Sequence, residues 1–463
     1  MLPSGPSTTA GVLTARLLPW ISATHAEKGT DRLGDIATVM YSQIAALGIF
    51  IAVFAIASMR HVHLGILMFA AACGVGVSLA GMPLRNIVGG FPLTIMVLLV
   101  GVTYFFAIAQ INGTVDAVIR SVLARVGHNT SILPFVFFAL AGGIASMGSG
   151  MAGLVVAPIG LPIARRSGMD PMLMALAIGC GISAGAFAPT SLFGIVSYGT
   201  AHQANIDLNP LVLFGVAAAA NLGLLIAAFV IFGGRSLLQH AASSASPSVP
   251  DVTSTLVSAP IGRHQIATIA CMIGLVVSVL ACVMNGIEPD IGVLTFAFGA
   301  LLALVDPASG KAAVLKIDWS TVLLVGGIVT FVGVLQTMGA VDLLGEMAST
   351  VSTPIVSALA ICLIGALVSA FASTTGILAA LVPLALPLVA SGHVAGWALI
   401  GALAVSASLV DVSPFSTVGA TLIASAHEEE RVRMTSLLTR WGMSMVVLGP
   451  VVLVGTLVLP SRF

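Results

Sequence analysis

Charged residues are scarce in this chain of 463 residues. Asp, Glu, Lys and Arg make up 7% of it, its 17 acidic and 17 basic side chains balance, and its mean hydropathy is +1.13. A soluble fold cannot bury a sequence that is 58% hydrophobic. The composition therefore predicts an integral protein of many spans in contact with membrane lipids. The sequence has no basic patch for nucleic acid, which excludes it as a partner.

Metal-binding and redox motifs are also missing. The five cysteines lie singly in apolar segments without CxxC spacing, which favours small core residues. The N-terminal residues 1–38 are too polar to span a membrane, and Arg16 and Pro19 interrupt their only apolar run. We expect this segment to be an extramembrane tail.

Apolar runs of spanning length follow the tail. They cover residues 41–58, 64–79, 92–111, 172–200, 211–232, 265–283, 291–305, 321–338, 397–426 and 437–459. Two further apolar stretches, 131–165 and 354–391, are too long for one span and are broken in the middle by small and polar residues. We interpret each as a re-entrant helical hairpin with its tip near the midplane.

The two halves of the chain repeat one another. Residues 110–116 resemble residues 336–342. Three prolines recur 225 positions further on, Pro158, Pro162 and Pro189 as Pro383, Pro387 and Pro414. Paired, proline-interrupted apolar segments in two halves of a membrane protein are typical of a transporter's substrate site. We expect the four prolines of the hairpins to kink the helix that leaves each tip.

Five crossings per half is an odd number, so the second half is expected to insert into the membrane in the opposite orientation to the first. With the N-terminus outside, most Lys and Arg residues fall on one side, and the other keeps Arg85, Arg462 and three residues of the tail. The sequence thus predicts an all-α polytopic membrane protein built from two inverted repeats of five transmembrane helices, each with a re-entrant hairpin and a broken helix. Both termini are predicted to lie on the outer side of the cell (inner) membrane. The expected segments are the tail 1–38, the first repeat 39–233 with inner hairpin 131–165 and broken helix 172–200, the cytoplasmic linker 234–264, and the second repeat 265–463 with outer hairpin 354–391 and broken helix 397–426.

Polar residues gather at the breaks, where hydrocarbon would make them costly unless they lined a cavity. Helix N-termini attract anions, and unwound carbonyls attract cations such as Na⁺. The breaks contain no Lys or Arg, so we expect hydroxyls, N–H groups and bound cations to hold an anionic substrate. The predicted substrate-binding residues are Ser146, Gly148, Ser149, Gly150, Pro189, Thr190, Ser191, Ser373, Thr374, Thr375, Pro414, Ser416 and Thr417.

Asp411 is the one acidic residue inside a broken span. An intramembrane carboxylate is by default a functional hypothesis, and this one could ligate Na⁺ or carry a proton. A capping carboxylate that faces water is the alternative. Its counterpart in the first half is Ala186, so two cation sites would differ.

Other classes fit less well. An intramembrane enzyme would need a nucleophile with its base, or a His/Asp metal cluster, and the spans offer no His or Lys. A channel is disfavoured because two occluding hairpins suit alternating access. The chain is therefore predicted not to be an enzyme and to need no cofactor other than a coupling ion.

The arrangement resembles the ion transporter superfamily, and residues 64–204 most resemble the N-terminal domain of MatC-type dicarboxylate (malonate) carriers, which are similar to the divalent anion/sodium symporters. The resemblance implies a scaffold that forms a homodimer and a transport part that moves as an elevator. It also implies Na⁺ sites between each tip and its neighbouring break. The implied ligands are Ser149, Gly150, Gly185, Ser373, Thr374, Asp411 and Ser413.

The symporters carry Ser-Asn-Thr at each tip. Here the tips read Gly148-Ser149-Gly150 and Ser373-Thr374-Thr375, without the Asn, which fits MatC-type carriers better than citrate or succinate symporters. The expected function is import of a small dicarboxylate, malonate first and C4-dicarboxylates second, by cation symport with Na⁺. Proton symport and anion exchange on the same fold are the alternatives.

Overall fold

All regular structure in the described part of the chain is helical, which confirms the predicted class. The computed structural model describes residues 31–60, 62–126, 131–148, 152–203, 206–233, 262–285, 290–341, 343, 353–370, 374–385, 388–389 and 394–462. Of the linker predicted at 234–264, residues 234–261 lie outside the described part of the chain.

Five helices in the described part are long and apolar enough to cross a membrane. They are the 38–57 part of α1 (Asp31–Arg60), α4 (Leu93–Ile111), α10 (Pro210–Ile231), α16 (Trp319–Thr337) and α23 with its extension to residue 458 (Glu428–Leu453). Helices at other predicted spans are shorter, such as α2 and α14 with 15 residues each. A helix of 15 residues rises about 22 Å, which is less than the hydrocarbon core of about 30 Å. The protein is thus an integral membrane protein with shorter and broken helices between long spans.

The remaining helices lie before, between and after these five. In the first half they are α2 (Leu64–Ser78), α3 (Leu84–Gly89), α5 (Thr114–Val126), α6 (Leu133–Ser146), α7 (Ala152–Arg166), α8 (Pro171–Gly185) and α9 (Leu192–Gln203). In the second half they are α13 (Arg263–Met284), α14 (Ile291–Val305), α15 (Pro307–Ala313), η1 (Val314–Lys316), α18 (Pro354–Ser369), α19 (Thr374–Leu384), α21 (Gly396–Leu409), α22 (Thr417–Ser425), η2 (Val454–Val458) and η3 (Pro460–Arg462). Pro158 and Pro162 lie inside α7 and Pro383 inside α19, whereas Pro387 is outside the described residues.

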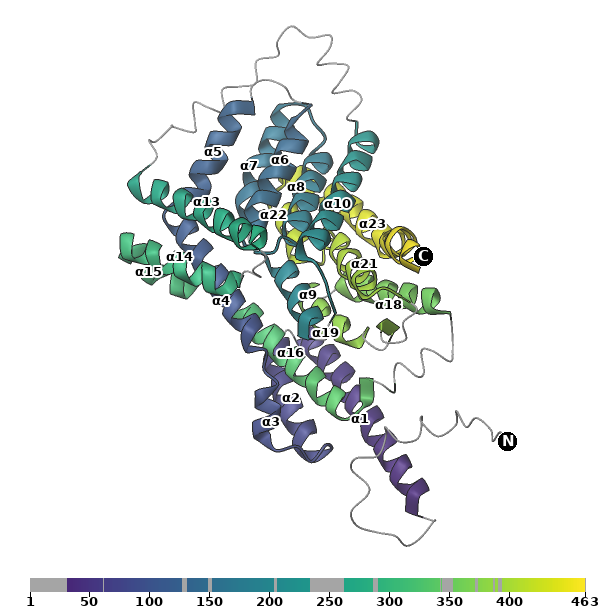
Figure 1. Cartoon of the computed structure of the whole chain (residues 1–463). Helices are drawn as coiled ribbons and strands as arrows, with labels where there is room; N and C mark the ends of the chain where they lie inside the picture. The colour runs from purple at the N-terminus through teal and green to yellow at the C-terminus, as the bar shows by residue number, and fades with distance from the viewer. Residues whose placement is uncertain are drawn as a thin grey trace, which may run out of the picture.

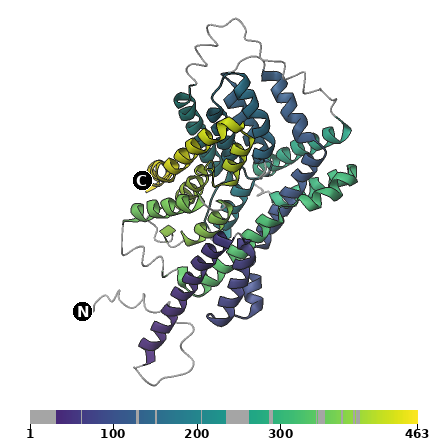
Figure 2. The ribbon, with the colours of Figure 1, turned by 180° about the vertical axis from the view of Figure 1, so that it is seen from behind.

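The helices gather in two groups, one at each end of the view in Figure 1. Helices α6, α7, α8, α10, α21, α22 and α23 lie together in the upper part, and α1, α2, α3 and α16 in the lower part. The view from behind shows the same separation (Figure 2). Helix α4 runs between the two groups and packs on α14, while α2 packs on α16.

Two glycine crossings repeat one contact in the two halves. Helix α2 meets α16 so closely that a Cβ on Gly327 would lie 1.9 Å from the Gly65 carbonyl oxygen. Helix α14 meets α4 in the corresponding way, with a Cβ on Gly101 2.8 Å from the Gly292 carbonyl oxygen. Gly65 corresponds to Gly292 and Gly101 to Gly327 in the repeat. Such exchanged contacts are what a two-fold relation between the halves produces.

Side-chain contacts exchange in the same way. Gln43 Nε2 of α1 donates to the Met338 carbonyl at 2.7 Å, and Gln265 Nε2 of α13 donates to the Asn112 carbonyl at 3.2 Å. Each carbonyl precedes a glycine with positive φ, Gly339 at 72° or Gly113 at 73°, which ends the helix. The two halves therefore fold these helix ends alike.

The corresponding serines of the two broken helices touch each other. Ser183 Oγ of α8 lies 3.0 Å from Ser408 Oγ of α21, and both side chains are buried. Residues at equivalent positions of two repeats can meet only on the axis that relates them. A two-fold axis that related the halves would thus pass between α8 and α21, near the two breaks that follow these helices.

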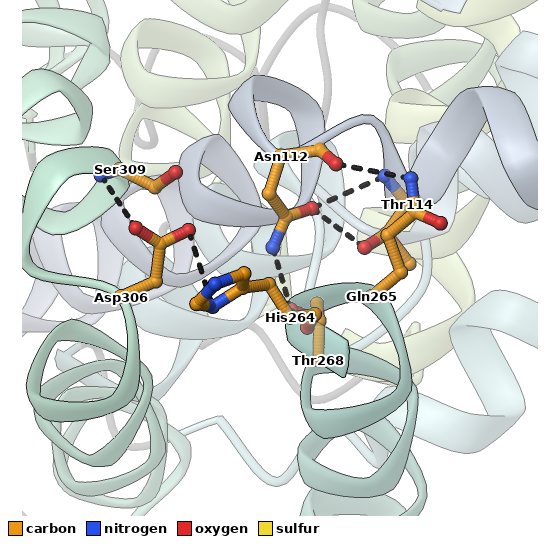
Figure 3. A network of polar contacts seen from close by, with 7 residues as sticks. All are labelled: Asn112, Thr114, His264, Gln265, Thr268, Asp306 and Ser309. Carbon is orange, nitrogen blue, oxygen red and sulfur yellow. Dashed lines mark hydrogen bonds and ion pairs between the residues drawn. The ribbon is translucent and has the colours of Figure 1, made fainter. Parts of the chain in front are cut away.

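The turn between α4 and α5 is held by a polar network (Figure 3). Asn112 Nδ2 donates to Thr268 Oγ1 at 2.7 Å, and Asn112 Oδ1 accepts from the N–H and hydroxyl of Thr114. Nearby, His264 Nδ1 lies 3.8 Å from an oxygen of Asp306. Met338 stands at the position of Asn112 in the second half and cannot make these side-chain bonds.

Candidate functional site

The first break is tied to the tip of the first helix pair. Thr190 Oγ1 donates to the Ser146 carbonyl at 2.6 Å, and Ser191 Oγ donates to the Ala145 carbonyl at 2.7 Å. These bonds satisfy carbonyls at the end of α6 that have no partner within the helix. The bend between α8 and α9 is therefore fixed against α6.

Glycines allow the backbones at this tip to approach. Gly148 has φ +77°, and a Cβ there would lie 2.8 Å from Val102 Cγ1 of α4 and 3.2 Å from the Thr190 carbonyl oxygen. A Cβ on Gly185 would lie 2.1 Å from the Gly142 carbonyl oxygen, so α8 and α6 touch there by their backbones. The resemblance implies Gly185 as a cation ligand, and this role stays a prediction. Its carbonyl accepts from the Ala188 N–H at 3.0 Å.

The second break repeats the plan with different hydroxyls. Ser413 Oγ donates to the Ala370 carbonyl at 3.1 Å, and Ala370 corresponds to Ala145. Ser416 caps α22 by accepting the Gly419 N–H at 3.0 Å, and its hydroxyl lies against the carbonyls of Ser413 and Asp411. Both breaks thus bind a serine hydroxyl to a backbone carbonyl at the C-terminal end of the neighbouring hairpin helix.

Asp411 supplies the carboxyl group of the site. Its side chain is 9% exposed, and Thr374 Oγ1, at the first residue of α19, donates to its Oδ1. Ser369, the last residue of α18, lies 2.8 Å from Thr374 through its hydroxyl. No Lys, Arg or His of the described residues pairs with Asp411. A buried carboxylate without a cationic partner suits a bound cation or a bound proton.

Several predicted site residues fall outside the described part of the chain. Ser149, Gly150 and Ser373 are among them, so their place in the site stays a prediction. Thr375 is buried beside Thr374, whereas Thr417 at the start of α22 is exposed. The remaining predicted residues border the breaks; these are Pro189 and Pro414, both half-buried.

The donors that converge here are oxygen atoms and helix ends. The C-termini of α6, α8, α18 and α21 and the N-termini of α9, α19 and α22 meet at the two breaks. Hydroxyl, carbonyl and carboxylate oxygens suit hard cations, and no described residues form a group of three or more His, Cys, Asp or Glu that could hold a metal ion. The oxygen set around Asp411 therefore fits Na⁺ better than a transition metal.

Sequence reasoning missed Ser369 and the Ser183–Ser408 contact. Ser369 could have been noticed as a polar residue five positions before Thr374. The serine contact had no local signal, because it depends on how the two halves meet.

Comparison with known proteins bears on the family and on the fold. Residues 40–186 match the family model of the dicarboxylate carrier protein MatC N-terminus, which confirms the resemblance over that part of the chain. A search of curated proteins finds no match. Among solved structures, the chain is similar to the YdaH transporter of Alcanivorax borkumensis, with 15% identity and a TM-score of 0.53 over 80% of this chain and 86% of that one. That similarity is one of fold.

Proposed function

We propose that this protein is a secondary transporter that imports a small dicarboxylate together with Na⁺. The observation that carries the proposal is the pair of breaks that contain hydroxyl side chains. Each break is hydrogen-bonded to the end of a hairpin helix, and the helices that precede the breaks touch at Ser183 and Ser408. The match to the dicarboxylate carrier MatC N-terminus supports the substrate class. Malonate is the first candidate and C4-dicarboxylates are the second.

The substrate carboxylates would meet hydroxyls and helix N-termini. Thr190 and Thr417 border α9 and α22, whose first N–H groups carry partial positive charge. The sequence places no Lys or Arg in either break. Weak fixed positive charge makes substrate binding depend on a cation, which is the thermodynamic requirement for coupling.

The cation would be held at the second break. Asp411 supplies a buried carboxylate, Thr374 and Ser413 supply oxygen atoms, and Ser373 is a further predicted ligand. At the first break Ser149, Gly150 and Gly185 are the proposed ligands. When bound, Na⁺ would neutralise Asp411 and add positive charge beside the substrate site.

Energetics favour such coupling. A dianion entering a cell that is negative inside is opposed by about 2.3 kcal/mol per charge per 100 mV. Two co-transported cations cancel this term, and a third makes uptake favoured by the membrane potential.

The exchanged contacts of the two halves support alternating access. With an odd number of crossings per half, a two-fold axis between α8 and α21 lies in the membrane plane and makes the repeats inverted. We place both termini outside the cell membrane and the 234–264 linker in the cytoplasm. The two helix groups would be the moving transport part and a dimeric scaffold.

Uptake of labelled malonate into proteoliposomes tests the function. Uptake should depend on an inward Na⁺ gradient at fixed pH and should be competed only weakly by succinate. Absence of uptake of both malonate and C4-dicarboxylates under any gradient would overturn the substrate class.

Proton symport is the second candidate, because Asp411 is a buried carboxylate whose partner Thr374 is a hydroxyl. In the same proteoliposomes, uptake driven by a proton gradient and indifferent to Na⁺ would favour it. Malonate uptake that requires malonate preloaded inside would indicate exchange.

A further inference from the structure

We propose that Ser369 is a positioning residue that fixes the proton of Thr374 toward Asp411 and so prepares only the second break for a cation. The inference rests on the proposed function, because it concerns the cation of that site. Ser369 is the last residue of α18, and Thr374 and Asp411 belong to α19 and to the break after α21.

The direction of the hydrogen bonds follows from the number of protons. An ionised carboxylate only accepts, and a threonine hydroxyl has one proton to donate. Thr374 donates that proton to Asp411 Oδ1. The contact of 2.8 Å between Ser369 Oγ and Thr374 Oγ1 must therefore be donated by Ser369.

This order leaves the correct atoms free for a cation. Thr374 Oγ1 accepts one hydrogen bond and keeps one lone pair. The second carboxylate oxygen of Asp411, Oδ2, takes no part in the bond with Thr374. A cation could thus take both oxygens without breaking the bond that Ser369 makes.

Burial gives the arrangement its strength. Ser369 is 0% exposed, Thr374 3% and Asp411 9%, so water does not replace these bonds freely. Without Ser369, the Thr374 oxygen would lose a partner in a buried place and its hydroxyl could rotate away from Asp411.

The first break has no counterparts of Ser369 and Asp411 in its sequence. The positions that correspond to Ser369 and Asp411 are Ile144 and Ala186, which have no polar side-chain atoms. The correspondence holds in space as well as in sequence, because Ala145 and Ala370 accept a serine hydroxyl in the same way. The two breaks are therefore unequal, and the fixed charge belongs to the second.

Binding of ²²Na⁺ to the purified full-length protein, by scintillation proximity at fixed pH, tests this role without transport. Ser369→Ala should weaken Na⁺ affinity about fivefold, or about 1 kcal/mol. Na⁺-dependent thermal stabilisation should shift to higher Na⁺ by the same factor. Ser406→Ala is the matched control, since Ser406 is fully buried and bonds only to its own helix through the Ala402 carbonyl; its Na⁺ affinity should not change.

A double-mutant cycle separates positioning from general damage. In the Asp411→Asn background, Ser369→Ala should have no further effect on residual ²²Na⁺ binding, whereas independent structural effects would add. Ser369→Cys, with a weaker donor of similar size, should be intermediate and serves if the alanine variant does not fold. Wild-type affinity in Ser369→Ala, or additive effects in the cycle, would overturn the positioning role while wild-type Na⁺ binding stands. Absence of ²²Na⁺ binding by the wild type would instead refute the proposed Na⁺ coupling, and the positioning role with it.

Discussion

The turn at each break requires a glycine, and replacing it tests the description of the site. A Cβ on Gly419 would lie 2.0 Å from the Ser413 carbonyl oxygen, and one on Gly194 would lie 2.2 Å from the Ala188 carbonyl oxygen. Real Cβ atoms essentially never approach closer than 3.0 Å, so either backbone must move by about 1 Å. We expect Gly419→Ala and Gly194→Ala each to lower the free energy of unfolding by about 1–3 kcal/mol.

Gly333→Ala is the control for these variants. Gly333 lies within α16, and a Cβ there would meet nothing within 4 Å. Alanine should stabilise this helix by about 0.5–1 kcal/mol, so the sign is opposite. Thermal unfolding in detergent measures stability, and labelled malonate binding should fall in the two break variants alone. Break variants that are as stable as Gly333→Ala, with unchanged binding, would refute the backbone arrangement.

Three further predictions concern charged groups. Asp411→Asn removes the buried charge while keeping the shape, so ²²Na⁺ binding should fall by at least about tenfold; unchanged binding would exclude Asp411 as a ligand. The pKa of Asp306 is lowered from its ordinary value, chiefly by the Ser309 hydrogen bond. The ionised carboxylate therefore stabilises the fold above the unfolded pKa of about 3.9, and this stabilisation is lost as pH falls through the lower folded pKa. Thermal unfolding measured from pH 6 to 3 should show that loss in the wild type and not in Asp306→Asn, and parallel curves would contradict it. Asp170 both caps α8 and pairs with Arg433 at 2.7 Å, so Asp170→Ala should destabilise by about 1 kcal/mol more than Arg433→Ala; equal thermal shifts would show that the cap contributes nothing.

Much of the helix plan could be predicted from sequence, because it depends on local signals. Apolar length, proline and small polar residues placed the breaks that separate α8 from α9 and α21 from α22. The repeated offset of Pro189 and Pro414 pointed to two related breaks. The lengths were less predictable, since α2 and α14 are too short for a full crossing and depend on their packing against α16 and α4.

The site's connections could not be predicted in this way. Composition shows that Ser, Thr and Asp gather near the breaks, but not which hydroxyl bonds to which carbonyl. Ser191 and Ser413 occupy non-corresponding positions, yet they bond to corresponding alanines. The sequence predicted no role for Asn112, which holds the turn between α4 and α5. Its partner Thr268 lies 156 residues away in the chain, so no local pattern pointed to the bond.

The central claim is that a dicarboxylate and Na⁺ move together through this protein. Accumulation of ²²Na⁺ in proteoliposomes under an inward malonate gradient, with no Na⁺ gradient and with the membrane potential clamped, tests that claim most directly. Coupling predicts Na⁺ uptake against its own concentration gradient, lost in Asp411→Asn. Malonate entry without any ²²Na⁺ movement would contradict it.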